Sequence, residues 1–248
     1  MFIILRKKTI GLFLSSLIFL GFSWGAFNYA AHPNMQNWKD QNLVITDVKT
    51  DQKVISLTFD DGPDPKNTPI VLDVLKKHNT PATFFLVGSR AEKYPELVKR
   101  IANEGHEIGN HSMNHSNYNG KTIEFLRNDI KQCNEIIHKI CGQRPVLYRP
   151  PGGYLSYDLV SLTQKEKVKI AYWTYQQDSK DWKSSSKAPQ ISNHIIKNLK
   201  PGQIIILHDG SSNGLESAKA LDLLIPELKH MSYNLVTMGE LIRLGNKE

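Results

Sequence analysis

The chain has 248 residues, which is enough for one sizeable hydrophobic core and argues against a second full domain. Lysine and arginine number 31 against 24 aspartates and glutamates, so the formal net charge is +7 at pH 7. Three of the basic residues lie in the first 31 residues, so the rest of the chain has 28 basic against 24 acidic residues. This surplus is small and forms no basic stripe, and we expect no nucleic-acid partner.

The first 31 residues combine a basic cluster, Arg6 to Lys8, with an apolar run from about Ile10 to Ala31. A run of about 20 residues is long enough to span a bilayer, whereas a cleavable signal usually has a shorter apolar region. We predict a transmembrane anchor over residues 1–31. A cleaved signal peptide is the alternative, although Trp24 and Asn28 stand where its cleavage site needs small residues. Either way we expect the rest of the chain outside the cytoplasm, membrane-bound or, after cleavage, secreted.

After this segment, residues 32–53 are polar and mixed, and we predict a stalk that leads into an entry strand. Strand and helix patterns then alternate over residues 54–248, which predicts one α/β domain with a parallel sheet. About seven such units favour a (β/α) barrel, and an open doubly wound sheet is the alternative. The predicted strands are residues 54–59, 82–87, 107–109, 146–148, 170–174, 203–207 and 234–237. The predicted helices are 69–77 behind an N-cap at Thr68, 94–103, 123–140, 156–165, 189–199 and 215–229.

Asp60 and Asp61 directly follow the first predicted strand, in "SLTFDDGP". Adjacent carboxylates repel each other, so the pair either belongs to a solvated turn or holds a cation. In a barrel, functional residues lie at the carboxyl ends of the strands. A position at a strand end therefore favours the interpretation that the pair holds a cation.

His111 and His115 follow the third predicted strand with a spacing of four residues, which places both on one face of a helical turn. The spacing suits one divalent ion, although a chain with nine histidines can contain it by chance. With Asp61 as third ligand, the set resembles a catalytic zinc site with an open position for water. Asp60 is then free to act as general base on that water.

Three later predicted strands are also followed by chemically versatile residues. Arg149 lies in "RPPGG", Asp178, Asp181 and Trp182 lie in "DSKDW", and His208 ends "IIILH". Taken singly, such residues are usually solvated charges, turn residues or loop caps. Their shared position at strand ends is what predicts a site.

The two cysteines, Cys133 and Cys141, lie eight positions apart in a predicted helix. That spacing is roughly 12 Å, beyond disulfide reach unless the helix ends before Cys141. We predict free thiols, and two are too few for a thiolate metal site.

Together these motifs resemble the polysaccharide deacetylases of the NodB-homology type, carbohydrate esterase family 4. The resemblance covers residues 54 to about 243, and its five motifs are "TFDDGP", "HSMNH", "RPPGG", "DSKDW" and "ILH", in the family's order. It implies a distorted (β/α) barrel of about seven strands and a metal-dependent N-deacetylase, with zinc as the expected ion.

The resemblance also implies a role for each motif residue. Asp60 is the implied catalytic base, and the implied metal ligands are Asp61, His111 and His115. The remaining implied roles are Arg149 holding the base, Asp181 orienting the general acid His208, the Gly152 backbone N–H binding the oxyanion, and Trp182 and Leu207 lining the acetyl pocket. Many members have an aromatic residue where this chain has Gly152, which affects the expected substrate groove.

The resemblance implies an N-acetylated glycan as substrate, and for an exported enzyme we expect N-acetylglucosamine in peptidoglycan. Chitin oligomers and acetyl esters of xylan are the alternatives within the family. A wall-binding module without activity is the non-enzymatic alternative. Such a module would have lost a ligand or the base, and this chain keeps Asp60, Asp61, His111, His115 and His208.

Overall fold

The computed structural model describes residues 34–245. Contacts divide the chain into one unit up to Gln41, in which α2 (Met35–Asp40) is described, and a second unit from Asn42 onward. The predicted anchor or signal segment, residues 1–31, lies outside the described residues. Within residues 34–245, no helix has both the length and the apolar character needed to cross a bilayer.

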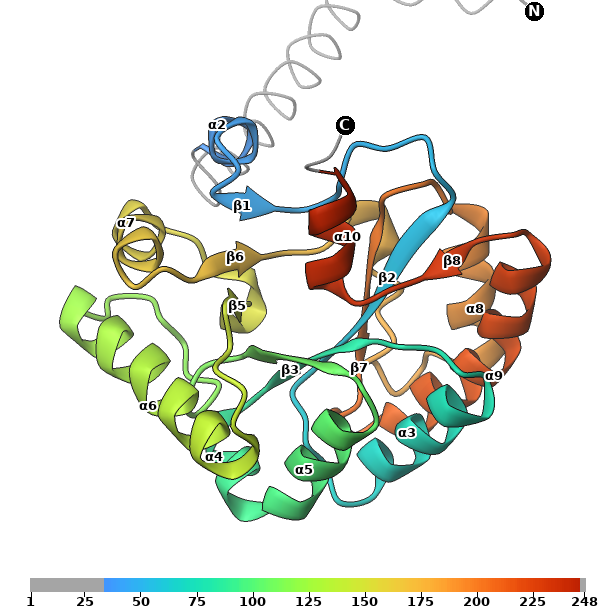
Figure 1. Ribbon diagram of the computed structural model, residues 1–248, viewed down its shortest axis with the longest axis horizontal. Helices are drawn as coiled ribbons and strands as arrows, with labels where there is room; N and C mark the ends of the chain where they lie inside the picture. Colours follow the sequence, from blue (N-terminus) through green and yellow to red (C-terminus); the bar gives the residue numbers. More distant parts are fainter. Residues whose placement is uncertain (1–33, 246–248) are drawn as a thin grey trace, which may run out of the picture. The chain divides into compact units, whose positions relative to one another are not determined.

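The second unit is built on a curled sheet in which every pairing between named strands is parallel (Figure 1). Seven strands follow one path in the order β1-β6-β5-β4-β3-β2-β7, and β8 pairs with β2 beside it. The predicted α/β architecture is therefore confirmed as a half-barrel. The strands are β1 (Val44–Ile45), β2 (Val54–Asp60), β3 (Thr83–Leu86), β4 (Glu107–Asn110), β5 (Leu147–Tyr148), β6 (Lys169–Ala171), β7 (Ile204–His208) and β8 (Asn234–Leu235).

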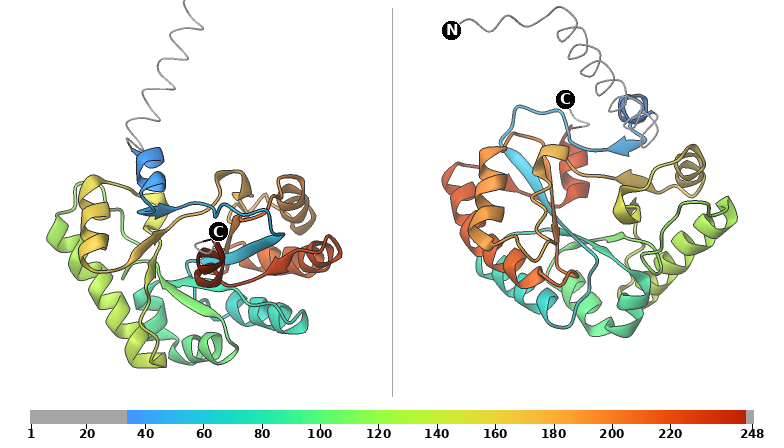
Figure 2. Two further views of the ribbon diagram at one scale, coloured as in Figure 1. Left: turned by 45° about the horizontal axis from the view of Figure 1, so that its top comes forward. Right: turned by 180° about the vertical axis from the view of Figure 1, so that it is seen from behind.

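Helices α3 to α6, α8 and α9 lie along the outer side of this sheet, as the front view (Figure 1) and the rear view (Figure 2) show. The helices of the second unit are α3 (Asn67–Lys77), α4 (Gly88–Lys93), α5 (Pro95–Asn103), α6 (Ile123–Cys141), α7 (Tyr157–Lys165), α8 (Ala188–Lys197), α9 (Gly214–His230) and α10 (Met238–Gly245). Short 3-10 turns follow β5 and β6, at Pro151–Gly153 and Tyr175–Gln177.

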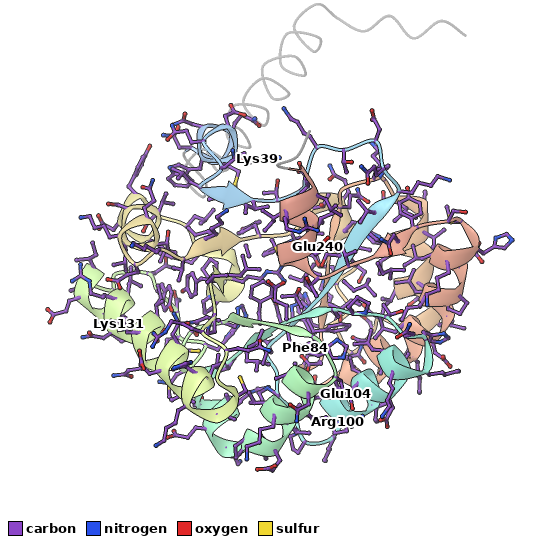
Figure 3. The ribbon with its side chains drawn as sticks, in the orientation of Figure 1. Lys39, Phe84, Arg100, Glu104, Lys131 and Glu240 are labelled. Atoms are coloured by element: carbon purple, nitrogen blue, oxygen red, sulfur yellow. The ribbon has the colours of Figure 1, made fainter. Side chains whose placement is uncertain are left out.

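The core explains why β2 is rich in apolar residues and includes threonine. All seven residues of β2 are buried, since helices cover one face of the sheet and the curled sheet covers the other. Phe59 of β2 stacks on Phe84 of β3 with ring centroids 4.9 Å apart. Phe84 lies in the interior, whereas Lys131, Arg100 and Glu104 lie at the periphery (Figure 3).

All seven predicted strands and all six predicted helices are present, with shifted ends. The patterns did not predict α2, β1, α4 or α10. The N-cap assigned to Thr68 is wrong: Thr68 lies inside α3, and its hydroxyl donates to Asp209. Asp64 caps the helix instead, because its Oδ1 accepts from the backbone N–H of Lys66 and Asn67, each at 2.9 Å. Cys133 and Cys141 are free thiols, as predicted.

Candidate active site

The strand register brings the sequence motifs together at the carboxyl end of the sheet. Asp60, the last residue of β2, is the Cα partner of His208, the last residue of β7. β4 ends at Asn110, directly before His111. A cleft of about 480 Å³ opens at this end. Its lining includes Asp60, Asp61, His111, His115, Gly152, Trp182 and His208.

Asp60 is held by a fully buried arginine. Arg149 Nη1 donates to Asp60 Oδ1 at 2.7 Å and to Thr58 Oγ1 at 2.8 Å. The other guanidinium nitrogens donate to the carbonyls of Ala171 and Tyr172, at 3.0 and 2.7 Å. The guanidinium also lies 4.0 Å from the ring centroid of Phe85. All three guanidinium nitrogens of Arg149 donate hydrogen bonds. Arg149 therefore fixes Asp60 Oδ1, and Asp60 Oδ2 takes no part in this ion pair.

Asp61, His111 and His115 form a compact cluster of possible metal ligands. Asp61 Oδ1 lies 3.3 Å from His111 Nε2 and 3.2 Å from His115 Nε2. Burial raises the pKa of Asp61, but the two imidazoles lower it by more, so this carboxyl is ionised at neutral pH. The carboxylate in turn raises the pKa of His115.

A divalent ion fits this cluster on two observations. Ligand atoms about 2.1 Å from a tetrahedral zinc lie about 3.4 Å from one another, close to the separations found here. Asp61 Oδ1 is also buried and has no hydrogen-bond partner among the described residues, although buried polar oxygens normally have one. His111 Nδ1 donates to the carbonyl of Arg149 at 2.7 Å, which leaves its Nε2 free for an ion.

The four-residue spacing predicted that the two histidines lie on a helical turn, and this is wrong. They lie in a loop after β4 in which Ser112 and His115 have left-handed φ angles of 72° and 51°. Asn110 Oδ1 accepts from the N–H of Ser112 at 2.7 Å, and Ser112 Oγ accepts from the N–H of His115 at 2.8 Å. Local side-chain hydrogen bonds therefore bring the rings together, with centroids 5.1 Å apart.

On the other side of Asp60, Asp181 holds His208 at two points. Asp181 Oδ1 accepts from His208 Nδ1 at 2.8 Å, and Oδ2 accepts from the His208 backbone N–H at 2.7 Å. Ser217 Oγ of α9 donates to the same Oδ2 at 2.5 Å. Asn213 Nδ2 donates to the Asp181 carbonyl at 2.6 Å. Asp181 has no exposed surface, and these hydrogen bonds hold its carboxylate beside the imidazole.

This arrangement favours a protonated His208. Burial lowers the pKa of His208, but the hydrogen bond to Asp181 and the carboxylates of Asp60 and Asp61 together raise it to about 9. At neutral pH the imidazolium can therefore donate a proton from Nε2, while Nδ1 stays on Asp181.

Gly152 and Trp182 both line the cleft, as the resemblance implies. Gly152 is exposed and has a left-handed φ of 58°, which a residue with a side chain adopts at a cost. Trp182 is 43% exposed, so part of its indole is open to a ligand.

Leu207, which the resemblance placed in the acetyl pocket, is not in the cleft. It is fully buried in the cluster beneath the outer helices. Side chains alternate along a strand, so the residue on the same face as His208 is Ile206, which does line the cleft. This alternation could have identified Ile206 from the sequence.

Trp173, just after β6, also lines the cleft and was not predicted. Its Nε1 is buried and has no hydrogen-bond partner among the described residues. The sequence gives little sign of this role, because a tryptophan at a strand end is more often part of a core.

The cleft thus combines an arginine-held carboxylate, a cluster suited to a divalent ion and a carboxylate-held imidazolium, which are the parts needed to hydrolyse an amide or ester. A family model described as polysaccharide deacetylase matches residues 47–188. The chain belongs to this family, carbohydrate esterase family 4 with its NodB-type domain, and is a polysaccharide deacetylase, a hydrolase.

Relatives and solved structures agree with this assignment. A peptidoglycan-N-acetylglucosamine deacetylase of Bacillus cereus is 43% identical over 201 residues, which are 81% of this chain and 93% of the relative. The peptidoglycan-N-acetylmuramic acid deacetylase PdaA of Bacillus subtilis is 37% identical over 229 residues, 89% of this chain and 85% of the relative. A crystal structure of a peptidoglycan N-acetylglucosamine deacetylase superposes with a TM-score of 0.80 at 36% identity, covering 84% of this chain and 96% of that one.

Proposed function

We propose that this protein removes N-acetyl groups from N-acetylglucosamine residues of peptidoglycan, with a zinc ion held by Asp61, His111 and His115. The observation that carries the proposal is the convergence of this cluster, the Arg149–Asp60 pair and the Asp181–His208 pair on one cleft. Each of the three groups supplies a different requirement of amide hydrolysis.

A divalent ion in the cluster supplies Lewis-acid chemistry, lowering the pKa of a water molecule towards about 7 and polarising the acetyl carbonyl. Asp60 accepts the proton of the attacking water. Arg149 holds Asp60 Oδ1, so the proton goes to Oδ2, which lies 3.8 Å from His111 Nε2. In this proposal the backbone N–H of Gly152 donates to the developing oxyanion, and losing one such donor costs about 3 kcal/mol.

His208 then donates its Nε2 proton to the departing amine. An amide requires this step, because an amine anion is a very poor leaving group. Asp181 keeps the imidazole protonated and oriented until the C–N bond breaks. Trp182, Ile206 and Trp173 give the cleft apolar walls that suit an acetyl methyl group.

The choice of peptidoglycan rests on the relatives and on the proposed location. Two of the relatives named above act on the two sugars of peptidoglycan, N-acetylglucosamine and N-acetylmuramic acid. We propose that the domain lies outside the cytoplasm, tethered by residues 1–31 or released after their cleavage, where it meets the cell wall. Chitin oligomers and acetylated xylan are the alternative substrates.

Acetate release from peptidoglycan, chitin oligomers and acetylxylan, with and without a chelator, tests the proposal. We expect the fastest release from peptidoglycan, its loss after chelation, and its return when zinc is added. The Asp60→Asn variant, which keeps all three proposed ligands, is the control for acetate released without the enzyme's base. Acetate release that survives complete metal removal would contradict the mechanism. Faster acetate release from chitin oligomers or acetylxylan than from peptidoglycan would contradict the proposed substrate.

A further inference from the structure

The short segment Val87–Arg90, at the start of α4, touches both loops that carry the proposed metal ligands. The N–H of Gly88 donates to the carbonyl of Ser112 at 2.9 Å, and the N–H of Ser89 donates to that of Met113 at 2.8 Å. The N–H of Val87 donates to the carbonyl of Gly62 at 2.9 Å. Figure 1 shows α4 directly after β3, the strand between β2 and β4. One segment therefore supports the loops after β2 and β4 together.

Within this segment, the side chain of Arg90 hydrogen-bonds to the Asp61 loop. Its Nη1 donates to the carbonyl of Asp61 and to the carbonyl of Gly210, both at 2.8 Å. Gly210 lies in the loop after β7, two residues beyond His208. A Cβ at Gly210 would lie 2.2 Å from the Asp61 carbonyl oxygen, so the two loops pack backbone against backbone. Arg90 thus joins the end of β2 to the end of β7.

The carbonyls of residues 60–62 show why this side chain matters. Asp60 accepts from the N–H of Gly210 at 3.3 Å, and Gly62 accepts from the N–H of Val87 at 2.9 Å. Those two bonds are backbone to backbone and do not depend on which side chains are present. The Asp61 carbonyl depends on Arg90, and Asp61 has a left-handed φ of 72°, a conformation that costs energy for a residue with a side chain.

We propose that Arg90 is a positioning residue that holds Asp61 in its left-handed conformation, with the carboxylate turned towards His111 and His115. Without the bond from Arg90, the Asp61 carbonyl loses its partner and the left-handed backbone loses its support. The carboxylate would then leave the ligand cluster more readily. No carboxylate pairs with Arg90 among the ion pairs of the described residues, so its hydrogen bonds to backbone are its main interactions. The inference rests on the proposed metal site.

Zinc affinity of the Arg90→Met variant tests this inference, measured by competition with a chromogenic chelator. Methionine keeps much of the length and apolar stem but removes both hydrogen bonds. We expect its zinc Kd to rise about 10- to 100-fold, the range found for residues that support metal ligands. Acetate release at saturating zinc should recover most of the wild-type rate, because the bound ion draws Asp61 back. Arg144→Met, which removes an exposed arginine paired with Glu135, is the matched control and should bind zinc like the wild type.

Two further measurements separate positioning from general stability and from charge. Thermal unfolding of the metal-free variants reports stability alone, so a lowered melting temperature with unchanged zinc Kd would overturn the inference. Arg90→Lys keeps the charge, but its nitrogen ends one bond short of the position of Nη1, so we expect weaker bonds to the two carbonyls and an intermediate Kd. A wild-type Kd in Arg90→Lys would overturn the need for the length and geometry of arginine even if Arg90→Met does not fold.

The same titration distinguishes this inference from the proposed function. If the wild type binds zinc and releases acetate while Arg90→Met binds zinc equally well, only the role of Arg90 fails. If the wild type binds no divalent ion, the proposed metal site fails, and the role of Arg90 fails with it.

Discussion

The two sides of the cleft are stabilised in different ways. The ligand side, defined by Asp61, His111 and His115, lies in loops with left-handed residues, and His115 has a side chain that is 45% exposed. The acid side, defined by Asp181 and His208, is almost enclosed, with His208 at 14% and Asp181 at 0% exposure. The carboxylate of Asp181 accepts three hydrogen bonds, whereas Asp61 Oδ1 accepts none from the described residues.

This difference indicates how each side reaches its working geometry. The acid side is preorganised by the protein alone, because its charges already neutralise each other in a fixed hydrogen-bonded pair. The ligand side gathers a carboxylate and two imidazoles that an ion would hold in place. We therefore expect ligand-side substitutions to change metal affinity and acid-side substitutions to change proton transfer and stability.

Asp61→Asn should have the largest effect. Asparagine tolerates the left-handed backbone and keeps the shape, but removes the charge that attracts the ion. Several kcal/mol of transition-state stabilisation should be lost, a fall in acetate release of about 10³-fold or more. Elemental analysis should show loss of zinc. Asp51→Asn, in an exposed loop, is the control, and undiminished zinc in Asp61→Asn would remove Asp61 from the ligands.

His208→Ala should reduce amide hydrolysis by about 10²- to 10⁴-fold and leave zinc content unchanged. The loss should be much smaller with p-nitrophenyl acetate, because a phenolate departs without a proton. This contrast between substrates separates the acid side from the ligand side, since loss of the ion should slow both reactions. Equal losses on both substrates would contradict the role of His208 as acid, and His230→Ala, on the surface, is the control.

The sequence predicted the sheet and most of the site because both follow from strand order. A parallel sheet brings every strand end to one edge, so Asp60, Asp61, His111 and His208 converge whatever the loops do. The strand β1 was not predicted because two residues, Val44 and Ile45, are too few for a period-2 pattern.

Supporting residues could not be predicted in this way. Arg90, Asn213 and Ser217 lie in or beside helices and contact the site only through the tertiary fold. The left-handed residues that replace the expected helical turn at His111–His115 depend on contacts of Asn110 and Ser112 that no spacing rule contains. Leu207 was misplaced by one residue, which in a strand moves a side chain to the opposite face.

Asp181→Asn should shift the pH profile on its alkaline side. Activity requires protonated His208, whose pKa of about 9 sets where activity falls as pH rises. Without the carboxylate, burial still lowers this pKa, so the fall should move to lower pH by roughly 1 to 3 units. Acetate release against pH measures the shift, with Asp158→Asn on the surface of α7 as control. An unchanged alkaline limb would show that another group titrates there.

The same pair predicts how stability depends on pH. The pKa of His208 is raised in the folded protein from 6.5 to about 9. Its contribution is therefore complete below about pH 6.5 and is lost as pH rises through about 9. Urea denaturation of the wild type and Asp181→Asn across this range should show the dependence in the wild type only.

Ser217→Ala should have the smallest effect, and mainly on stability. It removes one of three hydrogen bonds to a buried carboxylate, at a cost of about 1 to 3 kcal/mol in the free energy of unfolding. Activity should stay within several-fold of wild type, because both bonds from His208 still hold Asp181. Ser185→Ala, in the exposed loop before α8, is the control for urea denaturation. Zinc affinity should not change, and a weaker affinity would mean that the two sides are coupled through Asp181 rather than built independently.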